Sequence, residues 1–376
     1  MKPVSESELS EMIVAAEGPF RVVGGDTRPV GRVVDGDVLS TAQMSGVVDY
    51  EPGALTLVAQ AGTPVSEIKR RLAAEGQRLP FEPMDHRGLL GTSGEPTIGG
   101  VVAANVSGPR RVQAGACRDF LLGVRFVDGM GRVLKNGGRV MKNVTGYDLV
   151  KLMAGSRGTL GVLTEVSFKV LPTPPSRAVL LIEGLDDTRA VAAMTRALGS
   201  PFEVTGAAHM PVGMDGDPVT MIRIEGFTDS VEYRVGRLRD LLSEFGAITV
   251  ETDPERTAAG WRWVRDVEAF HERAGDVWRY SVKPSDGPAL GEALREMGAV
   301  AVLYDWGGGL VWALTPQGAD MRPAGLRGHA TLVRASEETR ARLPVFHPEP
   351  LAIQKISQGL RDRFDPKGIL NPGLMG

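Results

Sequence analysis

Short runs of apolar and polar residues alternate along the first half of the chain, and most of these runs end in a turn rich in glycine. Residues 20–23 (FRVV) indicate a strand. Residues 63–76 instead place Val65, Ile68 and Leu72 on one face of a helix, between a proline at its start and a glycine at its end. This part of the chain therefore predicts strands that alternate with helices.

The clearest strand pattern lies at residues 162–170 (VLTEVSFKV). Val162, Val166 and Phe168 fall on one face and more polar residues fall on the other, which predicts a strand buried on one side. Three prolines follow soon after, and proline disfavours helix and removes a backbone donor. We therefore place the end of a first domain at residue 175.

The second half of the chain has a different order of elements. The order β-α-β-β-α-β is typical of a split, ferredoxin-like α+β unit. Its predicted strands are residues 178–184, 202–210, 219–226 and 247–252, and its predicted helices are residues 188–199 and 230–246. The sequence thus predicts an α+β protein with domains at residues 1–175 and 176–345, followed by a C-terminal tail at residues 346–376.

Composition supports two domains and narrows the list of partners. A chain of 376 residues exceeds the usual size of one hydrophobic core. The 43 basic and 46 acidic residues give a net charge of −3, and no long block carries one sign. Since binding to a polyanion needs a basic stripe, we expect no nucleic-acid partner.

The single cysteine, Cys117, excludes an internal disulfide and a four-thiolate cluster on this chain alone, which favours the reducing cytoplasm. Residues 1–18 indicate an amphipathic helix, with Ser5 and Glu8 at capping-box spacing, and not a signal peptide. No run approaches the roughly 18 apolar residues that span a bilayer. We expect no direct membrane insertion, and any membrane association would come through partners.

The glycine-rich segment at residues 97–108 (TIGGVVAANVSG) is the strongest candidate for a binding site. Glycine lets a backbone approach an anion closely, and successive N–H groups form a concave donor site. Neither the P-loop pattern nor the dinucleotide fingerprint is present, which disfavours ATP and NAD. From glycine alone, a pair of tight turns with a small packing face is an equally good interpretation.

Several motifs together resemble the flavoproteins of the vanillyl-alcohol oxidase type. These motifs are residues 22–27, 97–111, 118–134, 155–170 and 364–373. The chain is more closely similar to the FAD-binding subunits of bacterial glycolate oxidases, through residues 137–156, 304–312 and 328–331. The resemblance implies a PCMH-type FAD-binding domain followed by a ferredoxin-like α+β cap domain, with the tail at residues 346–376 returning to the FAD domain.

The resemblance also implies which residues bind FAD. The first glycine turn would donate amides to the pyrophosphate, the second would follow the phosphates and the ribityl chain, and the start of a later strand would touch the other side of the cofactor. The residues implied are Gly24, Gly25, Asp26, Thr27, Thr97, Ile98, Gly99, Gly100, Val101, Gly108, Gly161 and Val162.

Departures from the wider family are equally informative. Many relatives attach FAD through a histidine in the first glycine turn, whereas Asp26 and Thr27 stand there in this chain, so we expect noncovalent FAD. Cys117 is expected to be a packed thiol and not a tether. Stand-alone D-2-hydroxy acid dehydrogenases of this type carry a histidine-rich segment that can hold a metal, but the five histidines here stand apart, so we expect no metal site.

The sequence offers no complete catalytic set. Oxidation of a 2-hydroxy acid needs a base for the hydroxyl proton and a cation for the carboxylate. His329, Arg279 and Lys283 are the candidates, with Tyr280 as a further possible base. For the arginine pair at residues 110–111, contact with phosphate, contact with a partner's acidic surface and simple solvation all remain open.

The leading hypothesis is an FAD-binding subunit that takes part in oxidising glycolate, together with a catalytic FAD-linked glycolate oxidase subunit and an iron–sulfur subunit. A small 2-hydroxy acid would be the substrate of the complex, and the chain alone would have little activity. The alternatives are a stand-alone FAD-dependent D-2-hydroxy acid dehydrogenase and a flavin-free assembly subunit.

Overall fold

The computed structural model describes residues 1–139 and 146–375, and the chain divides into two compact units. The first unit comprises Met1–Ser107, Ala116–Thr173 and Pro348–Gly376. The second comprises Gly108–Gly115 and Pro174–His347. The chain therefore leaves the first unit briefly, at residues 108–115, before it returns to complete that unit, and the sequence pattern gave no sign of this excursion.

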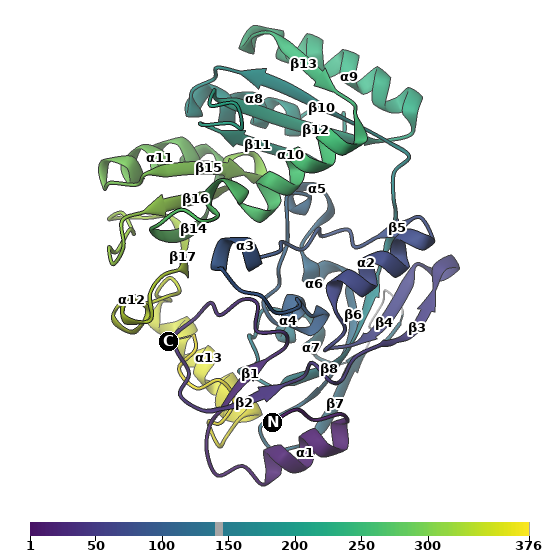
Figure 1. Ribbon diagram of the computed structural model, residues 1–376, viewed down its shortest axis with the longest axis vertical. Helices are drawn as coiled ribbons and strands as arrows, with labels where there is room; N and C mark the ends of the chain where they lie inside the picture. Colours follow the sequence, from purple (N-terminus) through teal and green to yellow (C-terminus); the bar gives the residue numbers. More distant parts are fainter. Residues whose placement is uncertain (140–145, 376) are drawn as a thin grey trace. The chain divides into compact units, whose positions relative to one another are not determined.

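The first unit is built on a five-stranded antiparallel sheet in the order β3-β4-β8-β6-β7 (Figure 1). Its strands are β3 (Val47–Glu51), β4 (Thr56–Gln60), β6 (Leu121–Val127), β7 (Val133–Gly137) and β8 (Val162–Lys169). Two small sheets join β1 (Phe20–Val23) to β2 (Asp37–Ser40) and β5 (Gln77–Arg78) to β9 (Leu171–Pro172). Its helices are α1 (Glu6–Val14), α2 (Val65–Ala74), α3 (Arg87–Leu90), α4 (Ile98–Ala103), α6 (Cys117–Phe120), α7 (Leu149–Met153) and α13 (Leu351–Phe364).

The C-terminal tail packs into the core of this unit, beside β1. Phe20 and Leu370 form a parallel bridge, and both are almost fully buried. The side chain of Asn371 accepts a hydrogen bond from the N–H of Val22 (2.8 Å) and donates one to the carbonyl of Arg157 (2.8 Å). The tail thereby ties β1 to the loop that precedes β8.

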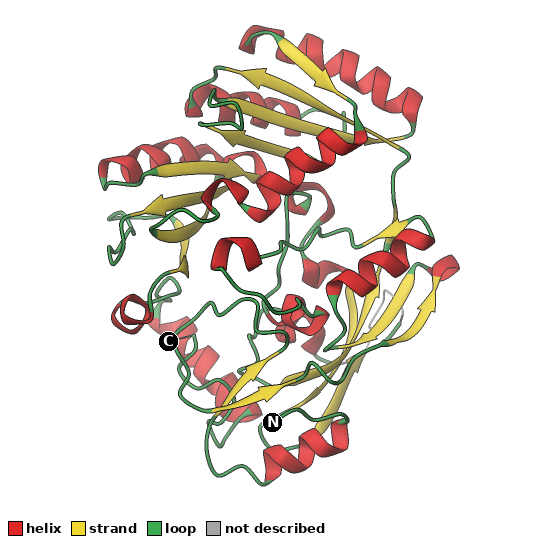
Figure 2. Cartoon of the chain, in the orientation of Figure 1, coloured by secondary structure: helices red, strands yellow, loops and turns green. Residues whose placement is uncertain are grey.

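The second unit is an eight-stranded antiparallel sheet in the order β13-β10-β12-β11-β15-β16-β14-β17, with helices on both faces (Figure 2). Its strands are β10 (Ser176–Glu183), β11 (Gly206–Met210), β12 (Val219–Gly226), β13 (Ile248–Glu251), β14 (Asp276–Val282), β15 (Ala301–Asp305), β16 (Leu310–Thr315) and β17 (Gly328–Arg334). Its helices are α5 (Arg111–Ala114), α8 (Asp187–Leu198), α9 (Thr228–Leu242), α10 (Pro254–Asp266), α11 (Gly287–Glu296) and α12 (Glu337–Arg342).

This sheet consists of two halves with the same strand order. Numbered along the chain, β10 to β13 have the spatial order 4-1-3-2, and β14 to β17 repeat it in mirror order across the sheet. The two halves meet where β11 pairs with β15. The first half is the predicted β-α-β-β-α-β unit, so that prediction is confirmed. The second half was not recognised from the sequence, because only its first four elements, β14, α11, β15 and β16, follow the same order.

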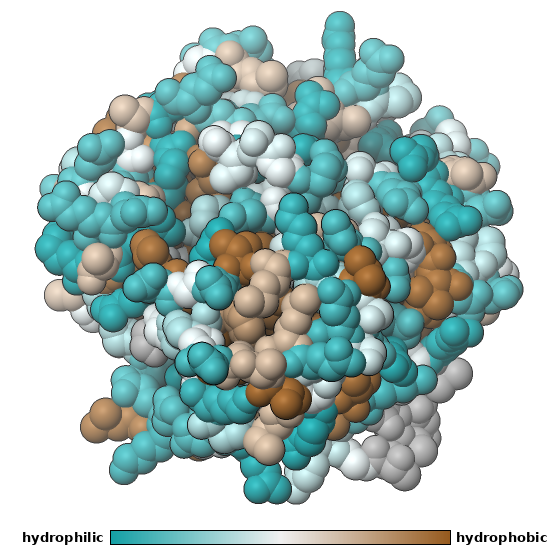
Figure 3. All heavy atoms as spheres, turned by 60° about the horizontal axis from the view of Figure 1, so that its bottom comes forward, coloured by the Kyte–Doolittle hydropathy of each residue, from teal (hydrophilic) through white to brown (hydrophobic). Residues whose placement is uncertain are grey.

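The prediction that residues 162–170 form a strand buried on one side was wrong in its burial. Strand β8 lies between β4 and β6 at the centre of its sheet, and Leu163 and Ser167 on its more polar face are buried as well. Polar residues with short side chains can occupy a covered sheet face. The alternation of apolar and polar residues therefore could not show whether one face of the strand is buried or both are. Elsewhere apolar residues are exposed singly or in separate groups, as on the face drawn in Figure 3.

Candidate functional site

The first glycine-rich loop, Gly24–Thr27, follows β1 directly. Among the described residues, its backbone N–H groups donate to no protein acceptor. Asp26 takes a left-handed conformation (φ +52°), and its carboxylate pairs with Arg21 at 2.9 Å. Successive N–H groups without partners, arranged around a left-handed residue, are suited to hold an anion.

The second loop uses its own N–H groups within the protein. Thr97 caps α4, and its hydroxyl accepts a hydrogen bond from the N–H of Gly100 at 3.3 Å. The N–H groups of Ile98 and Gly99 donate to carbonyls at 3.0 and 2.8 Å, and that of Val101 donates to Thr97. This segment therefore offers a ligand a surface and not a set of free donors.

Most glycines of these loops are required by the protein itself. A Cβ on Gly25 would overlap the carbonyl of Glu95, and a Cβ on Gly24 would overlap the hydroxyl of Thr97. A Cβ on Gly99 would lie 2.6 Å from that of Ala61. Gly100 differs, because a Cβ there would meet only the hydroxyl of Thr97, at 3.3 Å.

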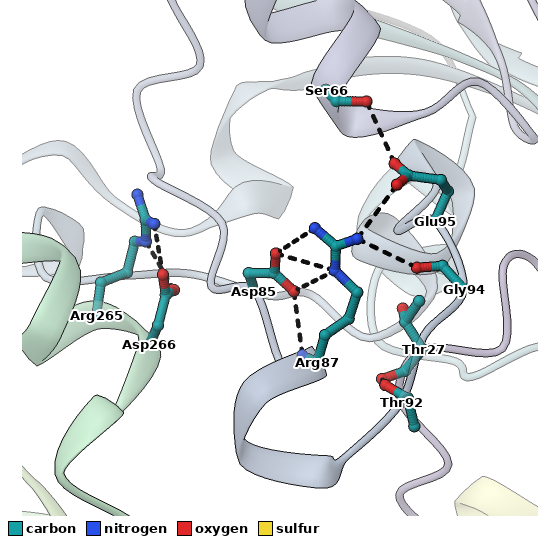
Figure 4. A network of polar contacts seen from close by, with 9 residues as sticks. All are labelled: Thr27, Ser66, Asp85, Arg87, Thr92, Gly94, Glu95, Arg265 and Asp266. Atoms are coloured by element: carbon teal, nitrogen blue, oxygen red, sulfur yellow. Dashed lines mark hydrogen bonds and ion pairs between the residues drawn. The ribbon is translucent and has the colours of Figure 1, made fainter. Parts of the chain in front are cut away.

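A polar clamp holds the two loops together (Figure 4). The guanidinium of Arg87 pairs with Asp85 at 2.8 Å and with Glu95 at 3.2 Å. The hydroxyl of Thr92 donates to the carbonyl of Thr27 at 2.9 Å. The segment between residues 85 and 95 is thereby fixed against the first glycine loop.

A third loop, residues 155–161, lies against the helix α4 of the second loop. The N–H groups of Gly155 and Arg157 donate to the carbonyls of the last turn of α4 at 3.0 and 2.7 Å. The hydroxyl of Ser156 is buried and has no hydrogen-bond partner among the described residues. Gly161 and Val162 are buried at the start of β8, where a Cβ on Gly161 would lie 2.7 Å from the ring of Phe126.

Three basic residues that sequence reasoning missed lie in or near the segments that form these loops. Arg28 follows the first glycine loop, and its Nη2 lies 3.5 Å from the carbonyl oxygen of Gly100. Arg157 reaches back from the third loop, so that its Nη1 lies 3.4 Å from the carbonyl oxygen of Val30. His86 precedes α3. The available signal was a basic residue directly after the first loop, one inside the third loop, and one in the segment between residues 85 and 95.

The pKa values of these groups show that they influence one another. Burial and the charge of Arg157 hold the pKa of Arg28 well below its usual value. Burial and the charges of Arg28 and Arg157 do the same for the pKa of His86. Burial lowers the pKa of Arg157 to about 10. A bound anion would stabilise the charged form of each group.

The catalytic candidates all lie in the second unit. Arg279 on β14 and His329 on β17 share one face of the sheet, because Ser281, two residues after Arg279, pairs with His329. The guanidinium of Arg279 lies 5.1 Å from the centre of the Trp306 ring. Lys283 is exposed beyond the end of β14. The geometry brings Arg279 and His329 onto a common surface and leaves their catalytic role a prediction.

Tyr280 is a core residue and not a base. It is fully buried, and its hydroxyl donates a hydrogen bond to the carbonyl of Met321 at 2.7 Å. Burial raises the pKa of this hydroxyl above its usual value. Strand alternation explains the difference, since Tyr280 faces away from the side of the sheet that carries Arg279.

The arginine pair at residues 110–111 serves the second unit. Arg110 is 3% exposed and forms an ion pair with the buried carboxylate of Glu225. The guanidinium of Arg111 lies 4.8 Å from the centre of the Trp306 ring. Trp306 in turn donates its Nε1–H to the carbonyl of Gly108 at 3.0 Å. Arg110 is therefore the buried ion-pair partner of Glu225. This role differs from the three that the sequence left open, namely contact with phosphate, contact with a partner's acidic surface and solvation.

Cys117 is fully buried, and burial raises the pKa of its thiol, so it is an inert packed thiol, as predicted. Within residues 1–139 and 146–375, no group of three or more His, Cys, Asp or Glu side chains is arranged to hold a metal ion. In the same residues, no helix is both long and apolar enough to cross a membrane.

Comparison with known proteins identifies the family. Residues 1–137 match the FAD binding domain family. The chain is 35% identical to glycolate oxidase subunit GlcE of Escherichia coli (strain K12), over 98% of this chain and 95% of that protein. It is 28% identical to mitochondrial D-2-hydroxyglutarate dehydrogenase of Bos taurus, over 94% of this chain and 71% of that protein.

The fold also matches a solved structure, that of p-cresol methylhydroxylase with substrate bound. The TM-score is 0.73 at 12% identity, over 100% of this chain and 88% of the other. This agreement confirms the predicted α+β fold of the vanillyl-alcohol oxidase type. The chain belongs to the PCMH-type family of FAD-linked oxidoreductases that includes glycolate oxidase subunit GlcE.

Proposed function

We propose that this chain is the FAD-binding subunit of a complex that oxidises glycolate to glyoxylate, and that it holds FAD noncovalently. The observation that carries the proposal is the 35% identity to a glycolate oxidase subunit over 98% of the chain. The partners would be a catalytic FAD-linked subunit, for which a further relative, glycolate oxidase subunit GlcD of Bacillus subtilis, is the model, and an iron–sulfur subunit.

The first unit supports the cofactor part of the proposal. The N–H groups of Gly24–Thr27 would hold the pyrophosphate, and the open side of Gly100 would face the cofactor. FAD supplies two-electron chemistry when bound. Asp26 and Thr27 support noncovalent binding, because they stand where many relatives carry the histidine that links to FAD.

A stand-alone D-2-hydroxy acid dehydrogenase is the second candidate, because the similarity to D-2-hydroxyglutarate dehydrogenase covers 94% of the chain. Against it stands the lack of a metal-holding histidine group among the described residues of the second unit. The sequence predicted five separate histidines, but the rings of His329 and His347 lie edge to face, with their centres 5.7 Å apart, and no third ligand from the described part of the chain joins them there. His209 is fully buried and its Nδ1 lies 3.0 Å from the hydroxyl of Thr220, so it is a core residue.

One reconstitution separates the candidates. The chain would be purified alone and then mixed with the catalytic flavoprotein and iron–sulfur chains of the same source, and glycolate-dependent dye reduction would be recorded. We expect activity from the mixture, a loss when this chain is omitted, and little activity from the chain alone. Turnover of glycolate or D-lactate by the chain alone, at the rate of the mixture, would show the stand-alone enzyme.

A further inference from the structure

Three basic residues of the first unit, Arg28, His86 and Arg157, influence one another's charge, and the backbone packing of the glycine loops does not account for their presence. They come from three segments far apart in the sequence. Arg28 and Arg157 each reach the backbone of a neighbouring loop, at Gly100 and Val30 respectively. Arg28 and Arg157 therefore lie where the three loops of the candidate cofactor site converge, and the charges of both act on His86.

The acidic side chains of the same loops are already paired with other arginines. Asp26 pairs with Arg21, and both Asp85 and Glu95 pair with Arg87. Arg21 and Arg87 balance two of these three carboxylate charges, and Asp85 also acts on His86. Like charges gathered in a partly buried place are unfavourable unless an anion joins them.

We propose that Arg28, with His86 and Arg157 beside it, binds the diphosphate of the flavin cofactor. This inference rests on the proposed FAD function. Arginine suits this task, because its planar group of donors matches the geometry of phosphate oxygens. The glycine-loop amides and the basic side chains would then share the diphosphate, which explains how the site binds its anion without a lysine.

The test uses protein from which flavin has been removed, with ADP-ribose and riboflavin as separate probes. ADP-ribose carries the diphosphate without the flavin ring, and riboflavin carries the ring without phosphate. Arg28→Gln should weaken the binding of ADP-ribose and of FAD about 10- to 100-fold, the usual value of a hydrogen bond to a charged group. Riboflavin binding should not change.

Two controls separate this role from a structural one. Arg32→Gln removes an exposed charge from the same segment and should leave all three affinities unchanged. The melting temperature of the flavin-free Arg28→Gln protein should equal or exceed that of the wild type, because the substitution removes repulsion between like charges. A variant that melts lower and loses riboflavin binding equally would show a structural role and overturn the inference.

The histidine adds a pH readout. Bound diphosphate should raise the pKa of His86, against the lowering effects of burial, Arg28 and Arg157 and with the help of Asp85 and a backbone contact at Met84. ADP-ribose should therefore bind more tightly as the pH falls from about 8 to about 5.5, since binding takes up a proton. In His86→Gln this dependence should be lost, and an unchanged slope would remove His86 from the site.

The two proposals can fail separately. If the wild type binds FAD but Arg28→Gln binds ADP-ribose equally well, only the diphosphate assignment is wrong. If the wild type binds neither FAD nor ADP-ribose, the FAD function itself is wrong and the assignment falls with it.

Discussion

Gly25 and Gly100 are both glycines of the candidate cofactor site, but for different reasons. The space beside Gly25 is filled by the backbone of Glu95, whereas the space beside Gly100 holds only the hydroxyl of Thr97 at 3.3 Å. A side chain at Gly25 therefore disturbs the fold. A side chain at Gly100 enters the place that we propose for the cofactor.

The two substitutions should consequently have separable effects. Gly25→Ala should lower the free energy of unfolding by about 1–3 kcal/mol, as overpacking does, while Gly53→Ala, with open space around it, should change it little. Gly100→Asp should keep most of the stability and abolish FAD binding, because it adds a charge and bulk at the ligand face. Urea denaturation and flavin absorbance measure the two effects. Normal flavin content in Gly100→Asp would show that this loop is misassigned.

At the scale of elements, a partly buried polar network joins the two halves of the second unit. Asp187 at the start of α8 accepts a hydrogen bond from Tyr304 of β15 at 2.6 Å and pairs with Arg295 of α11 at 2.7 Å. His209 of β11 lies 3.5 Å from the same carboxylate. Strands β11 and β15 meet only edge to edge, at His209 and Tyr304, so this network strengthens the weakest junction of the sheet.

The network predicts a stability that depends on pH. Burial alone would raise the pKa of Asp187, but the nearby His209 ring and the polar contacts with Tyr304 and Arg295 outweigh it and lower the pKa. Because the folded pKa is below the unfolded one, the stabilisation is complete above about pH 4 and is lost as the pH falls through the folded pKa.

Asp187→Asn should therefore flatten the decline of unfolding free energy below about pH 4. The exposed Asp229→Asn, on α9 of the same unit, should leave the decline as in the wild type. If both variants followed the wild-type curve, acid sensitivity would arise elsewhere in the chain.

The segment Gly108–Gly115 is a second element-scale feature, held to its unit by the ion pair of Arg110 and Glu225. Arg110→Met should cost about 3 kcal/mol, because it leaves a buried carboxylate without its main partner. The matched control Arg237→Met removes one half of an exposed pair and should cost less than about 0.5 kcal/mol. Equal melting of the two variants would mean that Trp306 and its contacts hold the segment alone.

At the scale of the whole molecule, the sequence predicted what depends on local pattern. The order of elements in residues 178–252 gave the first half of the eight-stranded sheet, and proline and glycine marked the helix at α2. It did not predict which glycines serve packing, because the backbone of Glu95 reaches Gly25 only after folding. The same is true of Arg28, His86 and Arg157, which are 58 and 71 residues apart in sequence before they meet.

The proposed function requires that this chain binds FAD, and its residues predict binding without a covalent link. The most direct measurement is the flavin content of the purified chain, followed by acid precipitation and the absorbance of supernatant and pellet. We predict stoichiometric flavin that is released entirely into the supernatant as FAD. A colourless protein that takes up no added FAD, or colour that stays in the pellet, would contradict the claim.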